Sequence, residues 1–352
     1  MKSHLFILLL LFLSTISAFS QTKPSLENTG TNGTLTTYNG STTIVEDGTV
    51  LKDLIINGSL NIRANNVIVK NCKITTDGFY GIRANFGYTS LLIEDCEISG
   101  MKSAAIFGNN FVARRCKIWD SGADGIKPGE NFLIEGCYFY NLGYIEDAHA
   151  DGIQMVAGGN GIIRGNTFDM PFDAPGYKNS QCIIILTNNA PIDDVKIENN
   201  WIDGGGYSVQ VRDKENGNGI PTNVSITNNL FGRNHQFGTH TIDDGVIWSC
   251  NKWEDTNQLI GECNINLSIN DELLQEKIAA YPNPASDQLT ITVQKIDECM
   301  ISIYNLEGGK VYQSLLNSKS TAISTENWSD GIYFIEYKTE NTHTRSKLII
   351  QN

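Results

Sequence analysis

The segment YIEDAHADGIQM, residues 144–155, contains His149, one of five histidines in the chain, beside several carboxylates. Its Asp-Gly-Ile triplet at 151–153 repeats a triplet at 124–126, within SGADGIKPG. The later copy differs because extra residues, including the histidine, precede it. Within an otherwise regular repeat, such an insertion indicates a loop with a task of its own.

Proton transfer is the chemistry that these residue types support. Histidine exchanges a proton near neutral pH without a large change in pKa, so His149 is a candidate acid or base. Lys127, which follows the earlier triplet, is a candidate base if burial or neighbouring cations lower its pKa. Two simpler interpretations stay open: His149 as a turn residue hydrogen-bonded to Glu146 or Asp147, and Lys127 as a solvated lysine.

The aspartates of the two triplets form a second candidate pair. If the triplets occupy equivalent positions in neighbouring repeats, the like charges of Asp124 and Asp151 repel each other and raise one pKa. Each aspartate lies two residues before an isoleucine, Ile126 or Ile153, that an alternating strand would bury. An inward Asp followed by Gly is suited to capping a bend of the backbone. We therefore favour capping, with the acid–base role left open.

The chain begins with the features of an exported protein. Residues 1–20 combine Lys2, an apolar run and a small-residue end before Gln21, which predicts a signal peptide. No other segment of the sequence is long and apolar enough to span a membrane. The net charge of −13 argues against nucleic acid as a partner, because its phosphates require a basic face. A local basic cleft for an anionic polymer is still compatible with this charge, and we expect a monomer.

Internal repetition is the strongest signal in the rest of the chain. Each repeat unit alternates apolar and polar residues, bends at a polar residue or glycine, and resumes with an apolar pair. Such a unit cannot bury its apolar face alone, but stacked units share a continuous core, about 4.8 Å from coil to coil. The eight units start at Asn66, Ser90, Asn110, Asn131, Asn160, Asp194, Asn223 and Gly245.

The seventh residue of each unit occupies one position of the stack. This ladder position reads Cys72, Cys96, Cys116, Cys137, Asn166, Asn200, Asn229 and Asn251. Stacked asparagines hydrogen-bond their amides along a turn, and the cysteines serve as small buried hydrophobes. Neighbours one coil apart exceed the Cβ separation of a disulfide, about 3.8 Å, so we expect free thiols. Cys250 and Cys263 bracket the last coil, which suggests a closing disulfide.

The spacing from the ladder position to the next strand locates the insertion. Nine positions separate Cys116 from Gly125, whereas fifteen separate Cys137 from Gly152. The following coil is longer still. Insertions at the same turn of adjacent coils should wall a groove on one side of the stack, and such a groove suits a linear polymer.

One column of side chains should face this groove. Each of its members follows an isoleucine that alternation sends inward, so all should point outward in register: Arg83, Phe107, Lys127 and Gln154. Lys127 and Gln154 should then lie one coil apart, with His149 on the adjoining bend.

The coil length, the asparagine ladder and the DGI strands resemble the right-handed parallel β-helix proteins, which include pectate lyases, alginate lyases and polygalacturonases. The resemblance covers residues 24–263, and we place the domain at 21–263. It implies an all-β fold, a parallel β-helix solenoid. Because this fold carries lyases, hydrolases, epimerases and adhesins without catalytic activity, it does not define the reaction.

The resemblance implies an extracellular polysaccharide as substrate, and the residues favour β-elimination of a uronic-acid polymer. Such a lyase needs a group that neutralises the sugar carboxylate, a base for the C5 proton and an acid for the leaving oxygen. The candidate catalytic residues are Lys127, His149 and Asp151. The candidates for substrate binding are Arg83, Asp124, Gln154, Arg164, Lys178 and Arg212.

Two other functions stay open. A glycoside hydrolase would use two carboxylates, such as Asp124 and Asp151, but this region lacks the consecutive Asp pair and the downstream Arg-x-Lys string of polygalacturonases. A glycan-binding surface protein without activity would need none of these roles. Calcium is a candidate cofactor without a ligand-spacing motif to support it, and its candidate ligands are Glu146, Asp147, Asp151, Asp169 and Asp173.

The repeat ends at Cys263, and residues 264–274 are expected to form a linker. Residues 275–352 alternate like the short strands of a small β-sandwich. Four motifs, YPNPA, IYNLEGGKV, GIYFIEY and KLIIQN, resemble in order the carboxy-terminal sorting domains of the type IX secretion system. This resemblance implies the secretion machinery as a partner and a secreted or surface-attached protein. A carbohydrate-binding sandwich is the alternative, with no aromatic platform beyond Trp328.

Overall fold

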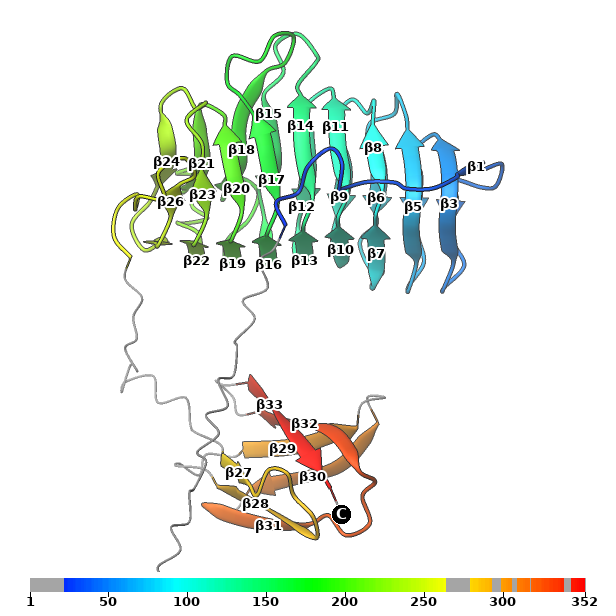
Figure 1. Ribbon diagram of the computed structural model, residues 1–352, viewed down its shortest axis with the longest axis vertical. Coiled ribbons are helices and arrows are strands. Elements are labelled where there is room, and N and C mark those ends of the chain that lie inside the picture. The colour runs from blue at the N-terminus through cyan, green and yellow to red at the C-terminus, as the bar shows by residue number, and fades with distance from the viewer. Residues whose placement is uncertain are drawn as a thin grey trace, which may run out of the picture. The chain divides into compact units, whose positions relative to one another are not determined.

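The computed structural model divides the chain into two compact units, Met1–Ile265 and Asn266–Asn352 (Figure 1). It describes residues 22–263, 279–292, 299–305, 309–316, 318–338 and 343–351. The predicted signal peptide, residues 1–20, and the predicted linker, residues 264–274, lie outside the described residues. The described part of the chain contains no helix with the length and hydrophobicity to cross a membrane.

The first unit is a stack of parallel coils, seen edge-on in Figure 1. One strand of each complete coil belongs to a nine-stranded sheet in which all pairs are parallel. Its members are β2 (Thr43–Ile44), β4 (Leu60–Ile62), β6 (Tyr80–Ala84), β9 (Ala104–Gly108), β12 (Asp124–Pro128), β15 (Ala150–Met155), β18 (Asn179–Leu186), β21 (Tyr207–Arg212) and β24 (Gly238–Ile242).

The remaining strands of the coils form a seventeen-stranded sheet that bends in its middle. Strands β3 and β5 continue through the bend, whereas later coils divide into two strands, as the strand–bend–strand pattern predicts. The members are β1 (Thr36–Thr37), β3 (Val50–Asn57), β5 (Ile68–Thr75), β7 (Leu91–Glu94), β8 (Glu97–Ser99), β10 (Phe111–Arg114), β11 (Lys117–Ser121), β13 (Glu130–Glu135), β14 (Tyr138–Leu142), β16 (Gly158–Arg164), β17 (Thr167–Met170), β19 (Ile192–Glu198), β20 (Trp201–Gly204), β22 (Thr222–Thr227), β23 (Leu230–Phe231), β25 (Ile247–Ser249) and β26 (Lys252–Trp253).

The bend depends on one residue with a left-handed backbone. Asn71, Asp95, Asn199 and Asn228 stand directly before a ladder position and have φ values of 51°, 54°, 56° and 57°. Asn and Asp tolerate this conformation better than most residues, because their short polar side chains bond to the local backbone. The polar bend residue of the repeat is therefore a conformational requirement.

The asparagine ladder predicted from the repeat is confirmed. Side-chain Nδ2 of Asn166 donates to Oδ1 of Asn200 (3.0 Å), and Asn200 donates in the same way to Asn229 (2.9 Å). Asn229 donates to Asn251 (3.0 Å), and all four side chains are fully buried. The last rung, Asn251, donates to the Ile226 carbonyl oxygen (2.8 Å), so the ladder carries polar groups through the core without an unpaired amide donor.

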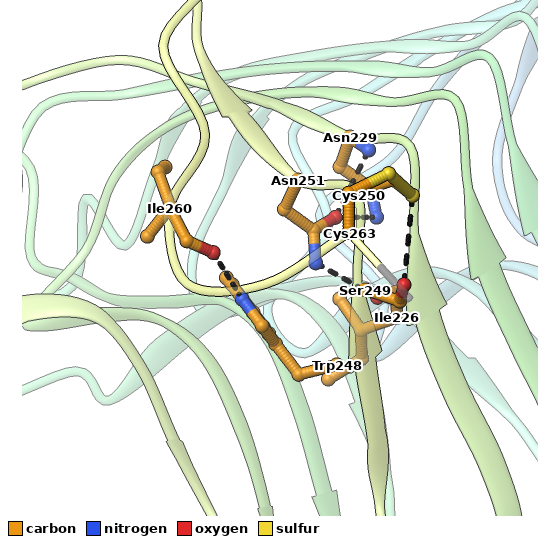
Figure 2. Close-up of a disulfide and its surroundings, with 8 residues drawn as sticks. All are labelled: Ile226, Asn229, Trp248, Ser249, Cys250, Asn251, Ile260 and Cys263. Atoms are coloured by element: carbon orange, nitrogen blue, oxygen red, sulfur yellow. Dashed lines mark hydrogen bonds between the residues drawn. A yellow bond between two sulfur atoms is a disulfide. The ribbon is translucent and has the colours of Figure 1, made fainter. Parts of the chain in front are cut away.

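The cysteine predictions are also confirmed. Cys72, Cys96, Cys116 and Cys137 are buried free thiols that continue the ladder. Cys250 and Cys263 form a disulfide, which Figure 2 shows beside Asn251, the last rung. The indole Nε1 of Trp248 donates to the Ile260 carbonyl oxygen (2.7 Å) in the same view. The bridge and this bond together close the last coil.

The second unit contains two antiparallel sheets. One holds β27 (Ala279–Tyr281), β28 (Gln288–Thr292) and β31 (Ser320–Ser324), and the other holds β29 (Cys299–Asn305), β30 (Lys310–Leu316), β32 (Gly331–Lys338) and β33 (His343–Ile350). Leu289 and Ile291 from the first sheet share one buried core with Ile303 and Ile335 from the second. The unit is therefore the small sandwich that the alternating strands predicted.

Candidate functional site

The predicted column of outward side chains lies on the nine-stranded sheet. Arg83 pairs in register with Phe107, and Phe107 pairs with Lys127. Gln154 follows in the next coil, because Ile126 pairs with Ile153 directly before it. The register prediction is therefore confirmed, with Lys127 and Gln154 in adjacent coils.

Two buried carboxylates lie beneath this column. Asp124 is 1% exposed and Asp151 is not exposed at all. Oδ1 of Asp124 accepts the Asp151 backbone N–H (2.8 Å), and Oδ1 of Asp151 accepts the N–H of Gln181 one coil further (3.0 Å). Each aspartate thus caps the start of the strand in the next coil, as the inward position and the following glycine predicted.

The second oxygen of each aspartate holds a candidate catalytic side chain. Lys127 Nζ lies 2.7 Å from Asp124 Oδ2, and His149 Nδ1 lies 3.4 Å from Asp151 Oδ2. Gln154 Nε2 also donates to Asp151 Oδ2 (3.0 Å). The carboxylate that holds His149 is therefore Asp151, and neither Glu146 nor Asp147, because the turn folds the imidazole back over the strand. Asp151 thereby fixes both His149 and Gln154.

Burial and charge shift the protonation equilibria of this cluster. Burial, followed by the neighbouring Asp151 charge, raises the pKa of Asp124 to about 6, although Lys127 opposes the shift. Burial also raises the pKa of Asp151, against the opposing hydrogen bond from His149. The hydrogen bond with Asp151 raises the pKa of His149. The cluster therefore contains groups that exchange protons close to neutral pH.

The glycine after each aspartate is required by close approach of neighbouring coils. A Cβ at Gly125 would lie 2.4 Å from the Gly152 carbonyl oxygen. A Cβ at Gly152 would lie 2.5 Å from the Cys182 carbonyl oxygen. Because both distances are shorter than any real Cβ contact, only glycine lets the aspartates stack, and the Asp-Gly-Ile triplet repeats for this reason.

A hollow of about 530 Å³ opens beside Lys127 and Gln154 at the carboxyl ends of their strands. We call it the groove hollow; its walls also include Phe86, Phe107 and Glu130. Its size is that of an ordinary small-molecule site. Two of the candidate site residues thus line a cavity open to solvent.

A second hollow of about 540 Å³ lies between the two insertions. The insertions are residues 143–149, between β14 and β15, and residues 171–178, between β17 and β18. The insertions in adjacent coils therefore wall a space on one side of the stack, as predicted, but the predicted column does not face it, because Phe107, Lys127 and Gln154 line the groove hollow instead. We call this space the loop hollow.

Aromatic rings form a cluster next to Lys127 that the sequence pattern did not predict. The rings of Tyr80 and Phe107 stack with centroids 4.5 Å apart, and Phe86 meets Phe107 edge-on at 6.1 Å. The Arg83 guanidinium carbon lies 5.9 Å from the centroid of the Phe107 ring. The sequence feature that could have predicted this cluster is the pair Phe79-Tyr80, which stands directly before Gly81-Ile82 in the strand that carries Arg83.

Of the remaining predicted residues, Arg212 and Lys178 occupy other parts of the face. Arg212 ends β21, two coils after β15, and its Nε lies 3.4 Å from Asp243 Oδ1. Lys178 lies in the second insertion and lines the loop hollow. The structure therefore groups Lys127, His149, Asp151 and Gln154 with Asp124, and Arg83 lies in the same column. Arg212 and Lys178 lie outside this group.

Arg164 does not join this group. It ends β16 in the other sheet, where its Nε lies 2.7 Å from Glu135 Oε1. It belongs to a column of side chains with alternating charge, paired in register from coil to coil: Lys70, Glu94, Arg114, Glu135, Arg164 and Glu198. We call this column the ionic ladder. A guanidinium held in it is not free to bind a substrate at the groove.

The candidate calcium ligands do not gather at one place. No group of three or more His, Cys, Asp or Glu side chains that could hold a metal ion occurs among the described residues. Asp169 lies on β17 in the other sheet, where its Oδ2 accepts a hydrogen bond from the Tyr138 hydroxyl (2.7 Å). Glu146 and Asp173 instead line the loop hollow.

Comparison with known families agrees with both units. Residues 34–190 match the family model of the right-handed β-helix region, and residues 279–351 match that of the secretion system C-terminal sorting domain. The chain therefore has a right-handed β-helix region and a carboxy-terminal type IX sorting domain. The sorting domain indicates a secreted or cell-surface protein, as the sequence predicted.

Individual relatives are distant. An endo-acting ulvan lyase of Formosa agariphila is 28% identical over 87 residues, which are 24% of this chain and 17% of that enzyme. This chain therefore matches about a sixth of that enzyme's length.

Two solved structures give weaker likenesses. The enzymatically active domain of tailspike protein 2 from bacteriophage CBA120 is 10% identical, with coverage of 86% of this chain and 68% of that chain and a TM-score of 0.31. The catalytic domain of an α-1,3-glucanase in complex with nigerose is 12% identical, with coverage of 64% and 60% and a TM-score of 0.28. Likenesses of this size transfer neither an activity nor a residue role.

Proposed function

We propose that the protein is a secreted polysaccharide lyase that cleaves a uronic-acid polymer by β-elimination on the outer face of the nine-stranded sheet. The observation that carries this proposal is the pair of neighbouring contacts, Lys127 with Asp124 and His149 with Asp151, in adjacent coils. They bring an ammonium group and an imidazole onto adjacent coils, and Lys127 also lines the groove hollow. The short match to an ulvan lyase agrees with a polysaccharide as substrate.

His149 is the proposed base. When its Nδ1–H donates to Asp151 Oδ2, Nε2 of the neutral ring is left free as an acceptor. The side chain is 65% exposed, so that nitrogen can reach a bound sugar. Asp151 holds the ring in one orientation, which makes it a positioning residue.

Lys127 is the proposed partner of the sugar carboxylate and the leaving oxygen. An ammonium group donates hydrogen bonds and accepts none, so Lys127 beside Asp124 is suited to these two tasks rather than to proton abstraction. Arg83, two coils away in the same column, supplies a second cation for a neighbouring carboxylate. Gln154 orients a sugar hydroxyl.

The elimination then balances as follows in bonds and protons. His149 Nε2 takes the C5 proton, and the electron pair of that C–H bond forms the C4–C5 double bond. The C4–O4 bond breaks, and Lys127 gives a proton to the departing O4. The products are a chain with an unsaturated uronate at its non-reducing end and a chain that ends in a free hydroxyl. The enzyme regains its starting state by passing one proton from His149 to Lys127 through solvent.

Glycoside hydrolysis is the second candidate, because Asp124 and Asp151 are adjacent carboxylates with raised pKa values. Hydrolysis requires both carboxylates to flank the bond that breaks. Here the side chains are buried under Lys127, His149 and Gln154, and each has one oxygen engaged by a backbone N–H. The arrangement therefore supports the lyase better.

A substrate panel separates these functions. The secreted chain is incubated with alginate, pectate, glucuronan and neutral glycans, and both the ultraviolet absorbance of unsaturated uronates and new reducing ends are measured. A lyase produces both signals, a hydrolase produces reducing ends alone, and a binding protein produces neither.

The site is tested by substitution on the polymer that responds. Lys127→Ala and His149→Ala should each lower kcat by about 100-fold or more, the usual effect of losing a general acid or base. Lys196→Ala, an exposed lysine of the other sheet, is the matched control and should leave kcat unchanged. Wild-type rates in both site variants would show that this cluster is not the active site.

A further inference from the structure

The loop hollow is a cavity that the proposed elimination does not use. Its walls come from both insertions and from the start of β18, and include Tyr144, Glu146, Phe172, Asp173, Tyr177, Lys178 and Asn179. Its volume of about 540 Å³ equals that of the groove hollow within a few per cent. The chain therefore carries a second cavity of ligand size on the same side of the stack.

The two loops that form the cavity brace each other. The Lys178 N–H donates to the Gly143 carbonyl (3.1 Å), and the Ala150 N–H donates to the Lys178 carbonyl (3.2 Å). The Phe172 N–H donates to the Asn234 carbonyl (3.0 Å), which ties the second loop to the segment between β23 and β24, two coils further on. Because backbone bonds hold both walls, the cavity exists before any ligand enters it.

Asn179 lines this cavity and carries a buried side-chain oxygen without a hydrogen-bond partner among the described residues. The residue is 2% exposed, and its Nδ2 donates to the Pro171 carbonyl (2.7 Å). No described residue donates a hydrogen bond to its buried Oδ1. A buried amide oxygen without a partner costs free energy, which a rotation of the Asn179 side chain toward a ligand O–H or N–H group would recover.

The other walls define the chemistry of that ligand. Glu146 and Asp173 add two exposed carboxylates, against the single cation of Lys178. Tyr144 and Tyr177 add aromatic rings, and Phe172 is 38% exposed. Negatively charged hydrogen-bond acceptors attract hydroxyl donors and repel a carboxylate. Aromatic rings pack well against the apolar face of a ligand. A neutral sugar ring offers both hydroxyl donors and an apolar face.

The position of the cavity relates this sugar to the cleavage site. Asn179 pairs in register with Ala150, the residue directly after His149. The groove hollow lies beyond Lys127 and Gln154, at the opposite ends of the same strands. The His149 and Lys127 side chains thus stand between the two cavities.

We infer that the loop hollow binds a neutral, hydroxyl-rich sugar unit next to the uronate that is cleaved, so that the substrate is a heteropolysaccharide of uronic acid and neutral sugar. This inference rests on the proposed function for the link to cleavage, but the binding of a neutral sugar stands without it. A polymer made of uronate alone would place a carboxylate against Glu146 and Asp173.

Binding is tested without any need for activity. Saturation-transfer NMR is recorded on the full chain with methyl glycosides of glucose, galactose, xylose and rhamnose, and with methyl glucuronide and methyl galacturonide. We expect at least one neutral glycoside to bind, and Tyr177→Ala to lower its signal by about fivefold or more. Phe86→Ala, which alters the groove hollow, is the matched control and should leave that signal unchanged. Equal loss in both variants, or stronger binding of the uronides, would overturn the inference.

Specificity is tested on polymers. Glu146→Lys with Asp173→Lys reverses the charge of the loop hollow at two exposed positions, so folding should not suffer. On a polymer in which uronate alternates with a neutral sugar, kcat/KM should fall about tenfold, whereas on polygalacturonate or alginate it should stay the same or rise. An unchanged ratio between the two polymers contradicts the inference even if cleavage occurs. Neutral glycoside binding without cleavage of any polymer would instead refute the proposed lyase and leave the binding site standing.

Discussion

The aspartates beneath the groove divide their oxygens between the fold and the site. In Asp124 and Asp151, Oδ1 accepts a backbone N–H from the next coil, while Oδ2 holds Lys127 or His149. Because the carboxylates are buried, they act on the polymer through the side chains above them. The structural role of each aspartate can therefore be separated from its proposed role in catalysis by a substitution that alters Oδ2 and keeps Oδ1.

Asp151→Asn is such a change. The amide oxygen still accepts the Gln181 N–H, so the free energy of unfolding should change by less than about 1 kcal/mol. The hydrogen bond that raises the pKa of His149 weakens when the negative charge is lost, so this pKa should fall. A base works in its neutral form, so the rise of kcat/KM with pH should move to lower pH, while the maximum drops about tenfold.

The pH–rate profile measures this effect. Asp169→Asn, on β17 of the other sheet, removes a carboxylate that lies away from the cluster and should leave the profile in place. A rise at the same pH in wild-type and Asp151→Asn protein would show that His149 is not the base.

At the scale of elements, two ladders hold the coils in register. The ionic ladder lies on the outer side of the seventeen-stranded sheet, and its alternating charges attract across every coil boundary from Lys70 to Glu198. The asparagine ladder runs through the core at the bend. The ionic ladder depends on charge and the asparagine ladder on hydrogen bonds. Their contributions to stability should therefore be distinguished by substitutions in each ladder and by the response to salt.

Glu135→Gln tests the ionic ladder. Glu135 Oε2 lies 2.7 Å from Arg114 Nε, and Oε1 lies 2.7 Å from Arg164 Nε. The substitution removes the negative charge and so weakens both ion pairs. Exposed pairs contribute little individually, so we expect a loss of about 1 kcal/mol at low salt that shrinks at high salt. Urea unfolding at two ionic strengths measures it. A loss that does not depend on salt would mean that packing, and not charge, accounts for the effect.

The pH dependence of that difference has a definite sign. Burial raises the pKa of Glu135, but hydrogen bonds from Arg114 and Arg164 outweigh it, so the net pKa is lowered. A lowered carboxyl pKa contributes stability above the unfolded value, about 4.3, and loses it as the pH falls through the folded value. The stability gap between wild-type and Glu135→Gln protein should therefore close below pH 4.

Asn200→Ala tests the asparagine ladder. Asn200 Oδ1 accepts from both the backbone N–H and the Nδ2 of Asn166, and its Nδ2 donates to Asn229 and to the Ile163 carbonyl. Alanine leaves these buried groups unpaired, so the free energy of unfolding should fall by about 3 kcal/mol or more. Cys116→Ala, at the same ladder position, removes a thiol and should cost about 1 kcal/mol. Urea denaturation compares the two, and equal losses would argue against a cooperative ladder.

At the scale of the whole molecule, the chain joins two units with separate cores. The β-helix core and the sandwich core share no residue among those described. The disulfide between Cys250 and Cys263 closes the last coil before the second unit begins. Each unit therefore has a core of its own among the described residues.

A chain that ends near residue 270 should therefore fold and keep any activity. Its urea transition should remain cooperative, with the same midpoint as the β-helix transition of the full chain, and its kcat should be unchanged. Calorimetry and the turnover assay measure both. A broad transition or a lost activity would place part of the β-helix core beyond Cys263.

Repetition made the fold readable from the sequence. A coil pairs with copies of itself, so a side chain's position within one unit predicts its neighbours in the next, as for Asn166 and Asn200 or Lys127 and Gln154. The alternation of inward and outward residues likewise predicted the buried Asp151 and the outward Arg83. These are local properties of a strand, and every coil of the stack repeats them.

The irregular contacts were decided by the tertiary structure. Inserted residues have no copy to predict them, so the partner of His149 proved to be Asp151 and not Glu146 or Asp147, the two carboxylates of the same loop. Arg164 is a different case, because it and its register partner Glu135 are each the fifth residue of their repeat units, so aligning the units in the sequence would have placed it in the ionic ladder. The loop hollow depends on two insertions that meet in space, and a sequence pattern shows their lengths but not the cavity that they enclose.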